Sequence, residues 1–358
     1  MSRALFRLAR AMVKHHLGMA DDPYLAALVV TWHCNARCTF CDVWKDRSIK
    51  QELTVDDYRR LLDPLSDLAV VKVTGGEPFL RPDIGALLRY LVDERHLLVQ
   101  VTSNGLLTAR IVDTLARLRH PLHLCISLDG FGPFVDERRG IPGYSERVLE
   151  TLRQLVDLKR RHLPGMFLAV NQTLFPDHPE QVALLREPLR AIGVDDIHYG
   201  IVHNLFDAEA SPEARMRYWT KLDPDYVAWA VALARNEPFT ALMRRATYRY
   251  FLAGVQNRVL RGEQRPSFRC QALSRYFRLM PNGDLVTCSV FRQRVDNLKE
   301  KSLAEACRGE AVQAARRQVV TCPGCWFGCE VVPNATISGA IFKGLFYRLD
   351  PSIRTKGP

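Results

Sequence analysis

Short apolar runs, many of them rich in β-branched residues, alternate with longer stretches of helical periodicity from residue 25 to about residue 205. Six of the runs predict strands, at 24–33, 69–76, 97–105, 122–130, 167–174 and 196–202. Amphipathic helices are expected between them, at 54–65, 81–94, 109–118, 144–161 and 179–192. Because strands and helices alternate regularly, the sequence predicts an α/β fold with a parallel sheet.

Polar and glycine-rich segments directly follow four of the predicted strands, at 33–41, 74–78, 103–105 and 127–130. The carboxyl ends of parallel strands lie at one end of a sheet or barrel, which is where such folds bind ligands. We therefore expect these four segments to converge on one site.

The rest of the chain has a different pattern. Residues 206–265 show helical spacing without a clear strand, and residues 266–332 carry five cysteines around an Asn282-Gly283 hairpin signal. The predicted organisation is an N-terminal helix (1–22), an α/β domain (23–205), a helical connector (206–265), a small cysteine-rich domain (266–332) and a C-terminal tail (333–358).

Composition narrows the function classes. The chain has 358 residues, 47% of them hydrophobic, and no run of about 18 apolar residues that would span a membrane. It lacks a recognisable signal peptide, so a cytoplasmic location is expected. Ten cysteines in a reducing compartment favour metal binding over disulfides. The formal net charge of +11 favours an anionic partner, and no motif indicates a specific nucleic acid.

The strongest motif is the C-x3-C-x2-C run of Cys34, Cys38 and Cys41. Three thiolates on one loop leave a metal centre with an open position, which catalysis requires. The alternative is a structural zinc site, for which His33 is an adjacent candidate ligand.

This triplet, with Phe40 before its last cysteine, resembles the defining motif of the radical SAM superfamily. The resemblance implies that the three cysteines hold a 4Fe-4S cluster whose fourth iron is chelated by S-adenosylmethionine (SAM). It also implies an electron donor such as flavodoxin or ferredoxin. One electron then cleaves SAM to a 5′-deoxyadenosyl radical, which abstracts hydrogen from a substrate.

Further segments resemble the SAM-binding parts of that family. They supply the candidate cofactor-binding residues Phe40, Gly75, Gly76, Glu77, Ser103, Asn104, Ser127, Asp129 and Arg139. By resemblance, the glycines approach the methionine amino group, Glu77 accepts its hydrogen bonds, and Arg139 binds the SAM carboxylate. The alternative is that the short polar residues are ordinary turn residues and that Arg139 belongs to a solvated charge run with Arg138.

The five late cysteines resemble the SPASM and twitch extensions that hold auxiliary 4Fe-4S clusters. The candidate metal ligands are Cys270, Cys288, Cys322, Cys325 and Cys329. Their number suits one auxiliary cluster, and the twitch pattern favours the first four, with Cys329 competing for the fourth place. A zinc site with four cysteine ligands is the alternative. Cys125 and Cys307 are interpreted as small buried hydrophobic residues.

Both ends of the chain carry basic amphipathic patterns. Near the N-terminus, Arg3, Arg7, Arg10 and Lys14 recur at helical spacing, opposite apolar residues. Such a helix either packs its apolar side on its own domain or lies on an anionic membrane surface. For a cytoplasmic protein, that surface is the inner face of the membrane.

The predicted fold is α/β, a partial (β/α)6 radical SAM barrel followed by a small cysteine-rich auxiliary cluster domain. The predicted function is a radical SAM enzyme acting on a small-molecule or lipid- or sugar-linked substrate. Only 33 residues precede Cys34, too few for a leader-binding domain. A SPASM-type maturase of ribosomally made peptides is the alternative, and a non-catalytic iron–sulfur or zinc protein is a third.

Overall fold

The structure is a computed structural model that describes residues 2–19, 22–41, 43–45, 51–201, 223–235, 242–260, 262, 268–322 and 325–346. All six predicted strands form, and each pairs in parallel with the next along the chain. They are β1 (Leu25–Val29), β2 (Val70–Thr74), β3 (Leu98–Ser103), β4 (His123–Ser127), β5 (Phe167–Leu174) and β6 (Asp196–Ile201). The predicted parallel α/β fold is confirmed.

The five helices expected between these strands also form. They are α2 (Val55–Leu62), α3 (Ile84–Arg89) with its π-helical continuation η3 (Tyr90–Glu94), α4 (Thr108–Ala116), α6 (Tyr144–Arg161) and α7 (Glu180–Ile192). Thr54 and Asp57 form a reciprocal capping box at the start of α2. Three short helices that periodicity did not predict lie in the loops: η1 (Val43–Lys45), η2 (Pro78–Leu80) and α5 (Gly132–Arg139).

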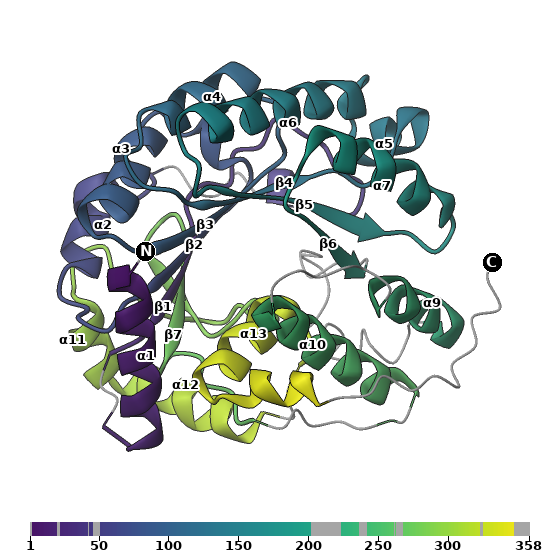
Figure 1. The fold of residues 1–358 in the computed structure, drawn as a ribbon. Helices are drawn as coiled ribbons and strands as arrows, with labels where there is room; N and C mark the ends of the chain where they lie inside the picture. The colour runs from purple at the N-terminus through teal and green to yellow at the C-terminus, as the bar shows by residue number, and fades with distance from the viewer. Residues whose placement is uncertain are drawn as a thin grey trace.

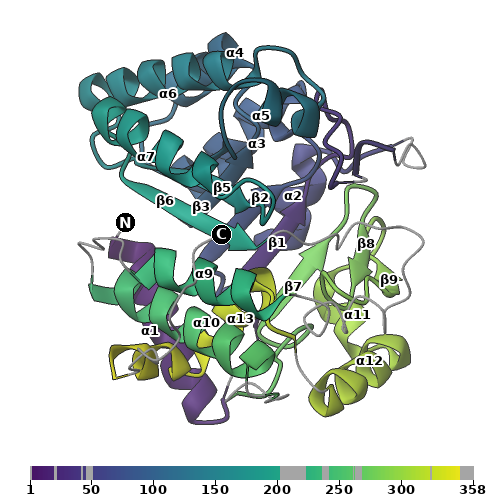
Figure 2. The same cartoon turned by 90° about the vertical axis from the view of Figure 1, so that its right-hand side faces the viewer.

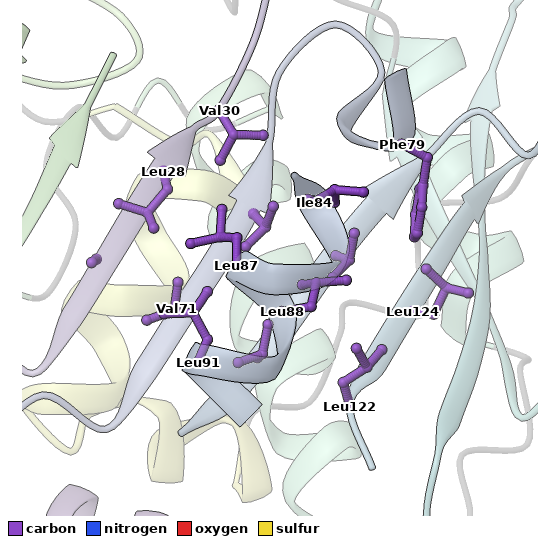
Figure 3. Close-up of a cluster of buried hydrophobic side chains, with 14 of the residues drawn as sticks. Leu28, Val30, Val71, Phe79, Ile84, Leu87, Leu88, Leu91, Leu122 and Leu124 are labelled. Carbon is purple, nitrogen blue, oxygen red and sulfur yellow. The ribbon is translucent and has the colours of Figure 1, made fainter. Parts of the chain in front are cut away.

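The main hydrophobic core lies between the outer face of the sheet and these helices. Figure 3 shows Val71 and Leu124 from the strands facing Leu87, Leu88 and Leu91 of the α3–η3 segment, and all five are nearly or fully buried. Burying each such side chain stabilises the fold by roughly 1.5–3 kcal/mol. Because strand residues alternate between faces, this packing directs every second residue to the inner face of the sheet.

The predicted hairpin at Asn282-Gly283 is confirmed. It joins β7 (Tyr276–Leu279) to β8 (Asp284–Val286), and β9 (Arg294–Asn297) pairs with β8. Gly283 has a φ of 87°, a conformation that favours glycine. β7 also pairs in parallel with β1, so the cysteine-rich region extends the barrel sheet to nine strands. The edge of β1 thereby gains a hydrogen-bonding partner.

Helices from the C-terminal half face the inner side of the curved sheet. Figures 1 and 2 show α10 (Leu242–Leu260) and α13 (Gly328–Ile337) across the sheet from α4 and α6. The remaining elements are α9 (Pro224–Arg235), α11 (Leu303–Arg308), α12 (Glu310–Thr321) and η5 (Ala340–Leu345). Residues 224–235 and 242–260 of the predicted connector are helical, whereas its residues 206–222, 236–241, 261 and 263–265, and residues 347–358 of the predicted tail, lie outside the described residues.

The N-terminal helix α1 (Ser2–His16) turns basic side chains toward the protein. Arg7 donates to the carbonyl oxygen of Arg95 at 2.8 Å, and Arg10 and Lys14 form ion pairs with buried Asp67 at 2.8 and 2.9 Å. Several apolar side chains instead face outward: Leu5, Phe6, Val13 and Leu17. Three of the four basic groups that would attract anionic lipid therefore bind within the protein. No helix among the described residues is both long and apolar enough to cross a bilayer.

Candidate active site

The cysteine triplet lies on the loop after β1, and the end of α5 packs against it. The backbone N–H of Arg37 donates to the carbonyl of Arg139, and that of Thr39 donates to the carbonyl of Arg138, both at 2.9 Å. A Cβ atom on Gly140 would come within 2.8 Å of the Arg37 side chain. Only glycine therefore allows α5 to approach the triplet loop this closely.

The two glycines after β2 are required by close backbone approach to the same loop. A Cβ atom on Gly75 would lie 2.3 Å from the Thr31 carbonyl oxygen, and one on Gly76 would lie 2.2 Å from that of His33. The Gly76 N–H donates to Thr31 at 2.7 Å, and the Glu77 N–H donates to His33 at 2.8 Å. These glycines hold the segment entering the cysteine loop, a structural role that the family resemblance did not indicate.

Glu77 joins the segments that follow β2 and β3. Its fully buried carboxylate accepts hydrogen bonds from Ser103 Oγ at 2.9 Å and from the Asn104 N–H at 2.7 Å. Burial raises the pKa of Glu77 to about 7, although these bonds and one from the Phe79 N–H oppose that shift. Asn104 also donates to Asn35 at 2.7 Å and lies 3.8 Å from the sulfur of Cys34. Three predicted site residues are thus brought together beside the triplet.

Asp129 and Arg139, which the resemblance assigned to SAM contacts, form a buried ion pair with each other. Asp129 Oδ2 accepts from Arg139 Nε at 2.7 Å and Nη2 at 2.5 Å, and Oδ1 accepts from the Thr173 N–H at 2.8 Å. Burial opposes the charge on Arg139, but Asp129 keeps the pKa of Arg139 well above its ordinary value. Arg139 Nη1 also lies 3.7 Å from the sulfur of Cys38. The guanidinium therefore connects the β4 loop to the triplet.

Phe40 and Ser127 complete the set of predicted cofactor-binding residues. The ring of Phe40 packs edge-on against Phe175 and under the guanidinium of Arg139. Ser127 is half-buried at the end of β4, where its carbonyl accepts from the Tyr144 hydroxyl at 2.7 Å. The neighbouring Arg138 pairs with Asp177 and does not lie beside Asp129.

The five late cysteines come from the segment before β7, the loop after β8, the end of α12 and the start of α13, and each lies near at least one other of the five. Cys288 and Cys270 lie close enough to influence each other electrostatically, as do Cys325 and Cys329. Burial, reinforced by nearby Glu330, raises the pKa of Cys288 to about 12. All ten cysteines are free thiols. Four or five uncrosslinked thiols in one buried region fit an iron–sulfur cluster.

Glu330 is a buried residue that the sequence interpretation missed. Its carboxylate accepts from the Tyr276 hydroxyl at 2.6 Å, from Ser289 Oγ at 2.6 Å and from Arg278 Nη2 at 3.3 Å. Burial opposes its charge, but Arg278 and these hydrogen bonds hold its pKa below the ordinary value. Glu330 therefore ties α13 to β7 and to the loop of Cys288. Its position next to Cys329 was the only signal for it in the sequence.

A second group that sequence reasoning missed lies on the inner face of β4 and β6. The sulfur of Cys125 is 3.3 Å from His123 Nε2 and 3.9 Å from His198 Nδ1, and it accepts a hydrogen bond from Gln100 Nε2 at 3.3 Å. Burial opposes ionisation, but the two histidines lower the pKa of Cys125 to about 6. Cys125 is buried as expected, yet its neighbours are polar. The alternation His123, Cys125, Ser127 along one strand was the available signal.

Comparisons with known proteins place these features in a family. The radical SAM superfamily matches residues 28–170, and the SPASM iron–sulfur cluster-binding domain matches residues 270–329. The AdoMet-dependent heme synthase of Methanosarcina barkeri is 30% identical over 51% of this chain and 51% of its own length. The subtilosin biosynthesis protein AlbA of Bacillus subtilis is 25% identical over 52% of this chain and 43% of its own.

The chain therefore spans about half the length of each of these two curated relatives. Among solved structures, Streptococcus suis SuiB bound to its precursor peptide SuiA shares the fold with a TM-score of 0.57. The likeness covers 86% of this chain and 70% of SuiB at 18% identity. A radical SAM domain implies a 4Fe-4S cluster and SAM as cofactors, and a SPASM domain implies auxiliary iron–sulfur binding. The chain therefore carries a radical SAM domain and, C-terminal to it, a SPASM iron–sulfur cluster-binding domain.

Proposed function

We propose that this chain is a radical SAM enzyme that modifies a peptide. The carrying observation is that Asn104, after β3, and Arg139, at the end of α5, approach the sulfurs of Cys34 and Cys38 on the triplet loop. When bound, the cluster and SAM supply the electron and the 5′-deoxyadenosyl radical that abstracts hydrogen from the substrate. The three thiols would hold the cluster, and Arg139 would orient SAM through its carboxylate. A flavodoxin or ferredoxin would donate the electron.

The test of radical generation is anaerobic SAM cleavage. The reconstituted protein, reduced with dithionite, should form 5′-deoxyadenosine, measured by liquid chromatography. Replacing the triplet cysteines together by alanine should abolish the product, because no other cysteine among the described residues lies on that loop. Cys307→Ala is the matched control, since Cys307 lies on α11 beside Arg316 and away from the triplet. Product from the triplet variant would refute the assignment.

Two observations favour a peptide over the small-molecule or lipid- or sugar-linked substrate expected first. SuiB, which shares the fold, is solved with a precursor peptide, and AlbA takes part in bacteriocin biosynthesis. The inner face of the sheet also carries Lys72, Gln100 and Asn171 in cross-strand register with its histidines. Such donors and acceptors suit amide groups better than an acyl chain, because buried polar groups left unpaired are costly.

A small-molecule substrate is the second candidate, favoured by the 30% identity to a heme synthase. Mass spectrometry separates the two. Host extract incubated anaerobically with SAM and either the enzyme or its triplet variant should differ in peptides, with mass changes confined to the active enzyme. Changes confined to small metabolites would refute the peptide proposal while leaving the radical chemistry intact.

A further inference from the structure

We propose that His123, Cys125 and His198 form a mononuclear metal site on the inner face of the barrel, with zinc as the metal that the ligands favour. This site would be separate from both cysteine clusters, since it shares no residue with either. It goes beyond the proposed radical function.

The distances suit tetrahedral coordination. Zinc binds sulfur at about 2.3 Å and imidazole nitrogen at about 2.0–2.1 Å, which puts neighbouring ligand atoms roughly 3.3–3.6 Å apart. The Cys125 sulfur lies 3.3 Å from His123 Nε2 and 3.9 Å from His198 Nδ1. All three ligand atoms lie within 4.8 Å of one another. A metal ion would need only small side-chain adjustments to bind all three.

The surrounding residues orient the ligands as in known metal sites. Asp196 Oδ2 lies 3.0 Å from His198 Nε2, and Nδ1 of the same ring lies 3.9 Å from the thiol sulfur of Cys125. A carboxylate on the second nitrogen of a ligating histidine is the usual arrangement around protein-bound metals. Gln100 donates to Cys125 at 3.3 Å. Asn171 Oδ1 lies 3.1 Å from His198 Nδ1, so a metal bound at Nδ1 would replace the proton that this contact uses. Parallel strand pairing holds Asn171 beside His198.

The proposed metal site lies near the segment predicted to bind SAM, where the substrate would also bind. Cys125 precedes Ser127 by two residues on β4, so it lies roughly 7 Å along the strand from the predicted SAM-binding segment. Both histidines are half-buried, so they are not sealed within the core. Three protein ligands leave one tetrahedral position for water or for a donor atom of the substrate, such as a thiolate or a carboxylate. One sulfur and two imidazoles favour zinc over magnesium or calcium.

The test is metal analysis of the reconstituted full-length protein after addition of one equivalent of zinc chloride and desalting. About one zinc per chain should remain, and zinc X-ray absorption should report one sulfur at about 2.3 Å with nitrogen or oxygen neighbours at about 2.0–2.1 Å. Zinc bound in the auxiliary site would instead report mainly sulfur. Absence of bound zinc, or a sulfur-only spectrum, would overturn the proposal.

Variants locate the site. Cys125→Ala and His198→Gln should lose the zinc while keeping the iron content of the parent, which also reports correct folding. Asp196→Asn should weaken zinc binding by roughly 10–100-fold, because Asp196 acts through His198. Cys307→Ala is the control and should keep the zinc. If zinc persists in both Cys125→Ala and His198→Gln, the metal is bound elsewhere and the proposal is wrong.

Discussion

Replacing Asp129 by asparagine tests the buried ion pair that joins the β4 loop to the cysteine triplet. Asp129 is 1% exposed and Arg139 is 8% exposed, so the pair is almost entirely removed from water. Asparagine keeps the shape, but its neutral side chain leaves the guanidinium without a compensating charge. Breaking a buried pair in this way costs about 3–5 kcal/mol. We expect Asp129→Asn to lower the free energy of unfolding by that amount.

The assay is urea unfolding of the chelator-treated protein, followed by circular dichroism under anaerobic conditions. Glu150→Gln is the matched control, because it breaks the pair of Glu150 with Arg153, whose side chains are 53% and 57% exposed. That change should leave the free energy of unfolding nearly unchanged, because solvent screens an exposed pair. A loss below about 1 kcal/mol for Asp129→Asn would refute the reasoning, since it would mean that Arg139 is solvated or otherwise paired.

The double variant separates structure from cofactor binding. Asp129→Asn with Arg139→Gln removes both charges, so it should be less destabilised than the sum of the single variants by roughly 1–3 kcal/mol. If Arg139 binds the SAM carboxylate, the double variant should still show a raised KM for SAM. A normal KM in the double variant would leave Arg139 with a structural role only.

Two further predictions concern the clusters' surroundings. Cys288→Ala should lose the auxiliary cluster absorbance and destabilise the C-terminal region, because metal binding contributes folding free energy there. Cys329→Ala should keep about seven to eight irons if the twitch-like ligand set holds. Loss of the cluster in Cys329→Ala together with its retention in Cys325→Ala would contradict that set. Because the pKa of Glu77 is about 7 when folded against 4.5 ordinarily, the folded state binds the proton more tightly and stability should fall as pH rises from about 4.5 to 7. This pH-dependent loss of stability is about 3 kcal/mol at most. Glu77→Gln should abolish it, measured by urea unfolding of the chelator-treated protein at several pH values. An unchanged dependence of stability on pH in this variant would show that Glu77 is not the group responsible.

The sequence by itself determined the six strands of the barrel, the five helices between them and the position of the candidate cluster ligands. Alternating apolar patterns identified six strands and five helices, because burial of one face imposes a period on the chain. The spacing of Cys34, Cys38 and Cys41 indicated the cluster, since ligands on one loop are close in sequence as well as in space. The Asn282-Gly283 turn was also predictable, because its conformation depends on local residue types.

Tertiary structure alone decided what depends on contacts distant in sequence. The pairing of β7 with β1 joined the cysteine-rich region to the barrel sheet, and no local pattern specifies a strand's partner. Asp129 and Arg139 were each assigned to SAM by resemblance, yet their mutual ion pair became visible only when α5 was placed against the β4 loop. His198 and Cys125 are 73 residues apart, and parallel register brought them together. Sequence periodicity says which face a side chain occupies, but only the assembled sheet determines which side chains meet on that face.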